Sequence, residues 1–144
     1  MYKKLLGDEH LDVARSLTNL ALLYDDQERY EEAEPLYLQS LEMRKKLLGD
    51  EHPDVAQSLN NLAVLYHAQG RYNEAEPLFL QALKIRKKRL GEAHPDVAHS
   101  LNGLAKLYHN QGRYGEAEPL FLQALKIRKT VSYTHLRAHE TFAN

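Results

Sequence analysis

The sequence predicts an all-α protein, an α-solenoid of tandem helix-turn-helix hairpins. The segment Gly49-Asp-Glu-His-Pro-Asp-Val recurs 42 residues later from Gly91, and a close copy begins 42 residues earlier at Gly7. Residues 69–87 and 111–129 differ at a single position. Apolar residues within each copy follow a helical period. A fixed period of about 20 to 50 residues is typical of a solenoid, whose stacked units share one continuous core.

Each unit contains two predicted helices, which are clearest in the middle copy. Leu59, Leu62 and Tyr66 lie at i, i+3 and i+7, on one face of a first helix. Gly70 is suited to the left-handed conformation that ends such a helix. A second apolar helical pattern follows around Phe79. The helices expected after a partial leading helix are 11–27, 30–47, 53–69, 72–89, 95–111 and 114–130.

The repeats divide the chain into units, and we expect the array to occupy residues 1–130. Residues 1–6 match the end of a second helix, so we expect them to end a preceding repeat of a longer protein. Leu11 replaces the prolines at positions 53 and 95, which suit the first helical turn, where an N–H lacks a partner anyway. The full repeats are 7–48, 49–90 and 91–130.

The segment 131–144 shares nothing with the repeats. Val131-Ser-Tyr-Thr-His-Leu-Arg-Ala-His-Glu-Thr141 resembles the translated sequence of a sequencing adaptor. We therefore expect a non-native tail and exclude it from functional reasoning. His135 and His139 have the i, i+4 spacing of zinc ligands on a helix, but no third ligand is nearby in the sequence. We expect no metal site.

The apolar pattern also carries a family resemblance. The motif L-x-x-L-A-x-x-Y over residues 59–66, followed by A-x-x-x-F-x-x-A over residues 75–82, resembles the tetratricopeptide repeat (TPR). The 42-residue period, with Leu-Asn-Asn-Leu-Ala and Glu-Ala-Glu-Pro-Leu, resembles the repeats of kinesin light chains and their bacterial relatives. The resemblance covers residues 3–129. It implies a right-handed superhelix whose first helices line the concave surface.

Composition argues against several classes of partner. A net charge of −1 gives no bulk attraction to nucleic acid or anionic membranes. No apolar run approaches the ~18 residues that a membrane span needs. The chain has no cysteine, which excludes disulfides and thiolate sites and fits a reducing compartment, so we expect a cytoplasmic protein.

Catalytic motifs are also missing from the sequence. It contains no phosphate-binding loop, no G-x-S-x-G and no H-E-x-x-H motif, so we expect neither an enzyme nor a cofactor. His10, His52 and His94 recur once per unit, just before a first helix. We expect them to pack on or cap that helix, because stacked units separate them too far for one metal ion.

The side of each first helix that faces away from its own hairpin holds the candidate peptide-binding residues. These positions vary between copies while the core positions barely change, which indicates a stripe freed from packing and available for recognition. The candidates are Arg15, Thr18 and Leu22 in the first unit, Gln57, Asn60, Val64 and His67 in the second, and His99, Asn102, Lys106 and His109 in the third.

The asparagines and the cations suggest what this surface binds. By resemblance, asparagines in the register of Asn60 and Asn102 hold the main chain of a peptide, since an amide offers both donors and an acceptor. A solvated polar role for these two residues remains open. Lys106 and the histidines favour an acidic ligand, whereas Asp25 and Asp26 disfavour it at the amino-terminal end.

The expected function is a non-enzymatic protein–protein interaction scaffold that binds an extended, acidic peptide on its concave face. The alternative is a structural or sensor array of a larger signalling ATPase or similar enzyme, acting by oligomerisation or autoinhibition. Both ends of the array lack a polar cap, so we expect them to self-associate end to end or to be covered by the parent protein.

Overall fold

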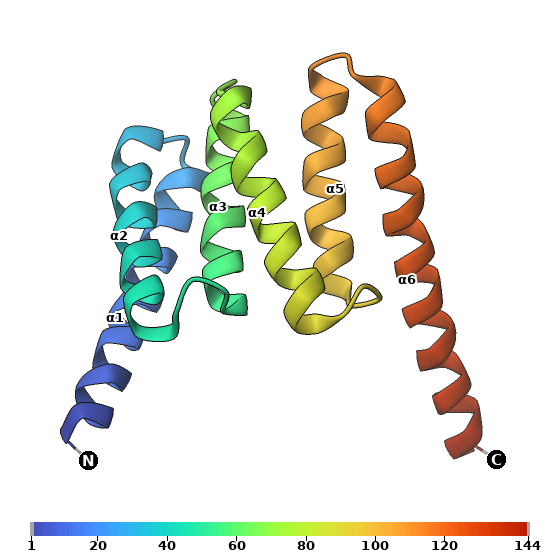
Figure 1. Cartoon of the computed structure of the whole chain (residues 1–144), viewed down its shortest axis with the longest axis horizontal. Coiled ribbons are helices and arrows are strands. Elements are labelled where there is room, and N and C mark those ends of the chain that lie inside the picture. The colour runs from blue at the N-terminus through green and yellow to red at the C-terminus, as the bar shows by residue number, and fades with distance from the viewer. Residues whose placement is uncertain (1, 144) are drawn as a thin grey trace.

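The computed structural model describes residues 2–143, with side chains over 10–138, and this range contains six helices and no strand. Met1 and Asn144, the ends of the predicted leading segment and tail, lie outside it, as does the side chain of His139. The helices are α1 (Tyr2–Asp26), α2 (Tyr30–Leu48), α3 (Pro53–Ala68), α4 (Tyr72–Leu90), α5 (Pro95–Asn110) and α6 (Tyr114–Ala143). They form three antiparallel hairpins in a row (Figure 1), which confirms the predicted solenoid.

The hydrophobic core is a seam that runs through all three hairpins. Ala63 and Ala75 are fully buried where α3 and α4 meet. Their small side chains let the two helices approach closely. Phe79 is also fully buried and fills the space towards α5. Burying a side chain of this size stabilises the fold by about 1.5–3 kcal/mol. Each hairpin therefore depends on its neighbours for part of its core.

The first helices of the second and third units begin with histidine caps. The backbone N–H of Asp54 donates to Nδ1 of His52 over 3.0 Å, and Asp96 donates to His94 over the same distance. Pro53 follows His52 as the first helical residue. The expectation is confirmed for His52 and His94, since each supplies an acceptor for a backbone donor that would otherwise lack one. It is wrong for His10, which is exposed inside the continuous helix α1.

Two predicted helix boundaries are wrong. We expected a break before residue 11, but α1 runs without interruption from Tyr2 to Asp26. A residue that precedes proline disfavours helical backbone, and Leu11 removes that constraint in the first unit. The last helix continues to Ala143 rather than ending near residue 130, because positions 116–143 contain no glycine and no proline after Pro119.

Candidate functional site

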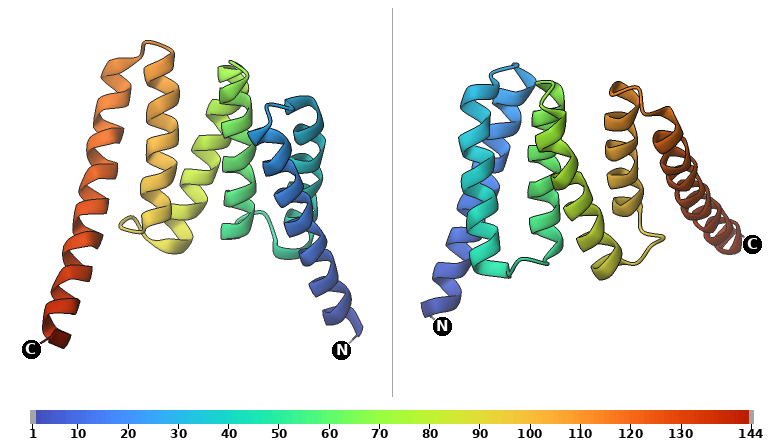
Figure 2. Two further views of the ribbon diagram at one scale, coloured as in Figure 1. Left: turned by 180° about the vertical axis from the view of Figure 1, so that it is seen from behind. Right: turned by 45° about the horizontal axis from the view of Figure 1, so that its top comes forward.

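The first helices form the inner wall of the stack. The contact between α3 and α5 is more extensive than any contact between second helices. A curved row of hairpins brings its inner helices together and spreads its outer ones, so the concave side is the side of the first helices. Figure 2 shows this side in its left panel, with α1 and α3 towards the viewer.

The structure leaves most of the predicted concave residues accessible. Those that are exposed are Arg15, Leu22, Gln57, Val64, His99, Lys106 and His109, whereas His67 and Asn102 are half-buried. Thr18 and Asn60 are buried. The eleven residues therefore do not form one open surface.

Thr18 and Asn60 point into the packed interior. The hydroxyl of Thr18 lies 2.7 Å from that of Ser40 on α2 and donates to the carbonyl of Ala14 over 3.0 Å. Asn60 is only 3 % exposed, and its Oδ1 has no hydrogen-bond partner among the described residues. The helix α3 packs against α2 and α4 and also contacts α5, while α1 packs against α2. The accessible part of each first helix is therefore narrower than the sequence analysis predicted from steps of three and four residues along one face.

Comparison of α3 with α5 locates this accessible part. The two helices, of 16 residues each, differ at four aligned positions. At three of them both residues are exposed. We call these six residues the variable stripe: Gln57, Val64 and Ala68 on α3, and His99, Lys106 and Asn110 on α5.

The fourth differing position, Asn61 against Gly103, serves packing. A Cβ on Gly103 would lie 2.7 Å from Cε1 of Phe79 on α4. Sequence reasoning did not predict Ala68 and Asn110 as part of the surface, although the difference between the two copies was visible at both positions.

The imidazole of His67 is half-buried and lies near the positive charge of Lys106. Its Nε2 lies 2.6 Å from Nδ2 of Asn110, which connects α3 to α5. Burial lowers the pKa of His67, and the nearby charge of Lys106 lowers it further. This imidazole therefore stays neutral to a lower pH than an ordinary histidine does.

His99 lies in a similar electrostatic environment. Burial lowers its pKa most, and Arg86, Arg128 and Lys106 add to this, while Asp96 opposes it. Because the pKa values of His67 and His99 are lowered, these histidines add no charge to the concave face near neutral pH. The positive character of this wall near α5 comes from Lys106 and the exposed Arg128.

The first unit presents a different, more acidic surface. Arg15 is exposed, and its Nη1 lies 3.9 Å from the carboxylate of Asp12 on the same helix. Asp25 accepts a hydrogen bond from the hydroxyl of Tyr37 over 3.2 Å, and burial raises the pKa of Asp25. Asp26 is exposed. The cationic part of the concave face therefore lies in the third unit.

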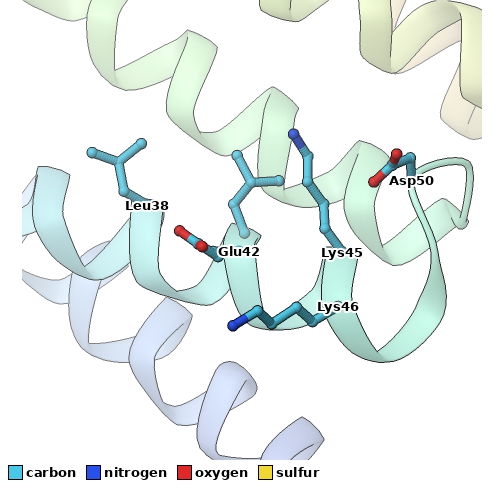
Figure 3. A pocket seen from close by; sticks show the side chains of 6 residues that line it. Leu38, Glu42, Lys45, Lys46 and Asp50 are labelled. Carbon is cyan, nitrogen blue, oxygen red and sulfur yellow. The ribbon is translucent and has the colours of Figure 1, made fainter.

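A hollow on another part of the surface contains none of the candidate residues. A cavity of about 570 Å³ borders α2, lined by Leu38, Leu41, Glu42, Lys45, Lys46 and Asp50 (Figure 3). Over the described residues, no group of three His, Asp or Glu side chains could hold a metal ion, and no helix is long and apolar enough to cross a membrane.

A known protein family matches the chain along its repeats. The family profile of the tetratricopeptide repeat matches residues 1–46, 26–88 and 54–130. The chain belongs to the tetratricopeptide repeat family. TPR arrays are in general protein–protein interaction modules, and the fold is typically a non-enzymatic scaffold.

Solved structures confirm the kinesin-light-chain-like character of these TPRs. BtubC (BKLC) from P. vanneervenii is 30% identical with a TM-score of 0.77, and the match covers 83% of this chain and 48% of that one. A Podosopora anserina putative kinesin light chain with nearly identical TPR-like repeats is 32% identical with a TM-score of 0.72, covering 83% and 57%.

More distant matches show the fold alone. The TPR domain of Arabidopsis FLU is 18% identical with a TM-score of 0.72, and the match covers 86% of this chain and 98% of that one. The chain spans about half the length of the two kinesin-light-chain-like proteins. No curated protein sequence matches it.

Proposed function

We propose that this TPR array is a non-enzymatic scaffold that binds an extended, acidic peptide on its concave face. The observation that supports the proposal most directly is the variable stripe. Two helices of almost identical sequence differ mainly where their side chains are exposed on the inner wall. Packing does not require these differences, and recognition of a ligand would.

The chemistry of the stripe suits a peptide in an extended conformation. Val64 is 44 % exposed and offers an apolar contact at the position that the exposed Lys106 occupies in the next unit. The half-buried amide of Asn102 can both donate to and accept from a peptide backbone. Lys106 favours acidic side chains in the ligand. We expect a Kd of order micromolar, about −8 kcal/mol.

Asn60 fits this proposal only after a side-chain rotation. Its Oδ1 is buried without a partner, and an unsatisfied buried acceptor costs roughly 1–3 kcal/mol. A peptide N–H reaching the groove would provide the missing donor. Replacing Asn60 with alanine removes the unsatisfied group, so we expect the variant to be at least as stable as the wild type.

A charge reversal tests the ligand chemistry. Random peptides are selected on the wild type, on Lys106→Glu and on Lys84→Glu, which makes the same change on the exposed side of α4. We expect acidic sequences to be enriched by the wild type and by Lys84→Glu, and to be lost with Lys106→Glu. Equal enrichment by all three proteins would contradict the proposal of an acidic ligand.

A second pair of variants tests the surface itself. The double variant Asn60→Ala with Asn102→Ala should lose peptide binding while its melting temperature stays the same or rises. The control is Asn73→Ala, an exposed asparagine at the start of α4 that should leave binding unchanged. Unchanged binding by the double variant would exclude the asparagines from the contact.

A further inference from the structure

Both junctions between hairpins contain the same charged contact, which we call the acid clamp. Glu34 on α2 accepts hydrogen bonds from the hydroxyl of Tyr66 over 2.8 Å and from Nη1 of Arg71 over 3.2 Å, both in the next unit. The guanidinium of Arg71 also stacks 4.2 Å from the ring centroid of Tyr66. At the second junction Glu76 accepts from Arg113 over 3.3 Å.

A second repeated contact, the arginine clamp, lies deeper in each junction. Arg44 on α2 is buried, and its Nη1 donates to the hydroxyl of Ser58 over 2.8 Å and to the carbonyl of Asp54 over 3.4 Å. Arg86 on α4 is buried in the same way and donates to Ser100 over 2.9 Å. Each junction therefore uses a Glu and an Arg from one unit and a Ser, a Tyr and an Arg from the next.

The two ends of the array carry the unused halves of these clamps. On α6, Glu118 and Arg128 occupy the register of the clamp residues on α2 and α4, and both are exposed. No hydrogen bond or ion pair links either of them to another described residue. At the opposite end, Ser16 is exposed on α1, and Arg29 stacks 4.3 Å from the ring of Tyr24.

Apolar residues around the unused clamps are exposed where their counterparts are buried. Leu23 on α1 is 51 % exposed, whereas Leu65 at the same position of α3 is fully buried. Leu125 on α6 is 49 % exposed, against 8 % for Leu83 on α4. The α1 face also exposes Val13 and Leu20, and the α6 face exposes Tyr114, whose counterpart on α4 is half-buried. Both faces thus match the two sides of a junction that the chain already makes twice.

We propose that the two end faces bind each other, so that copies of the chain stack end to end with the α6 face of one copy on the α1 face of the next. Glu118 then accepts hydrogen bonds from Tyr24 and Arg29 of the neighbouring copy, and Arg128 donates to its Ser16. The contact joins two different faces, so it does not close on itself as a symmetric dimer does.

The charge pattern identifies a second copy as the occupant of each face. An apolar face alone would accept many partners, but these faces add a carboxylate at one end and a Tyr–Arg pair at the other, in the register of the internal acid clamps.

One-sided variants test the proposal by sedimentation velocity over about 10 to 500 μM. We expect the wild type to form a concentration-dependent series of dimers and larger oligomers. Leu23→Glu blocks the α1 face and Leu125→Glu blocks the α6 face, so each variant alone should stay monomeric. An equimolar mixture retains one intact pair of faces and should stop at a dimer.

The matched control is Leu22→Glu, which makes the same change next to Leu23 but on the concave face, and which should associate as the wild type does. Circular dichroism confirms that each variant is folded. A monomeric wild type would show that these faces serve another partner and would overturn the proposal. Association of Leu23→Glu alone, or a mixture that stays monomeric, would overturn it as well.

The acid clamp is tested separately with Glu118→Gln, which keeps the shape and removes the charge. We expect roughly tenfold weaker association, since a hydrogen bond to a charged group is lost from the contact. Glu116→Gln is the control, because Glu116 pairs with Arg113 inside its own unit. Equal effects of the two variants would exclude the proposed register.

Discussion

Gly103 on α5 lies directly against the ring of Phe79 on α4, where a Cβ would come within 2.7 Å of Cε1. Phe79 is fully buried, so its ring cannot move aside without disturbing the core. The equivalent positions one unit earlier hold Asn61 and Tyr37. The second and third units are therefore adapted to each other at this contact, beyond the differences in the variable stripe.

Glycine replacements measure this contact. We expect Gly103→Ala to destabilise the protein by about 1–3 kcal/mol, because overpacking outweighs the gain of about 1 kcal/mol in helix propensity. Gly115→Ala is the control, since a Cβ there meets no atom within 4 Å, and it should stabilise the protein by up to about 1 kcal/mol. Urea unfolding provides both values, and a stabilising Gly103→Ala would contradict the packing argument.

The buried Arg86 and the exposed Arg128 provide a second pair of variants for measuring stability. Arg86→Ala removes the hydrogen bond to Ser100 and leaves a cavity in place of the aliphatic part of the side chain. We expect a loss of about 1–3 kcal/mol. Arg128→Ala, at the equivalent exposed position, should change stability by less than about 0.5 kcal/mol at low protein concentration. Equal losses would mean that the arginine clamp does not stabilise the junction.

Stability should fall on mild acidification partly because of His99. Its pKa in the folded state is lowered, so the unfolded chain binds a proton more readily, and the stabilisation present above the usual histidine pKa is lost as pH falls through the folded value. His99→Gln, which introduces the residue found at position 57, should reduce the loss measured by urea unfolding between about pH 7 and pH 5.

The histidine cap of α5 can be removed without touching the core. His94→Ala deletes the acceptor for the backbone N–H of Asp96, and we expect a loss of about 0.5–2 kcal/mol in the free energy of unfolding. His94→Asn keeps an acceptor at the N-cap and should recover most of that loss. If both variants are equally destabilised, the hydrogen bond to Nδ1 does not contribute.

The hairpins could be predicted well from the sequence because the same buried positions recur in every repeat. Ala63, Ala75 and Phe79 recur with almost no change, and all three are buried where helices meet. The start of α1 was less predictable, since only Leu11 signals that the proline found before the other first helices is missing. One substitution in the first unit was a weak signal beside the helix start that recurs in the second and third units.

The surface was harder to predict than the core. Helical periodicity shows which side of α3 faces its own hairpin, but not how much of the remaining arc a neighbouring helix covers. Asn60 appeared open for that reason and is buried. Ala68 was missed because alanine suggests packing, although its counterpart Asn110 indicated otherwise. Pairing of Arg86 with Ser100 joins residues 14 apart in different helices, which no local pattern reveals.

Since one 42-residue segment supplies both partners of every clamp, an extra copy inserted by gene duplication would meet surfaces it already fits. No compensating mutation would be needed for the longer protein to fold. Each insertion would also add a fresh set of inner-wall positions like Val64 and Lys106, free to diverge at once. The array can thus lengthen, and acquire new binding preferences, one unit at a time.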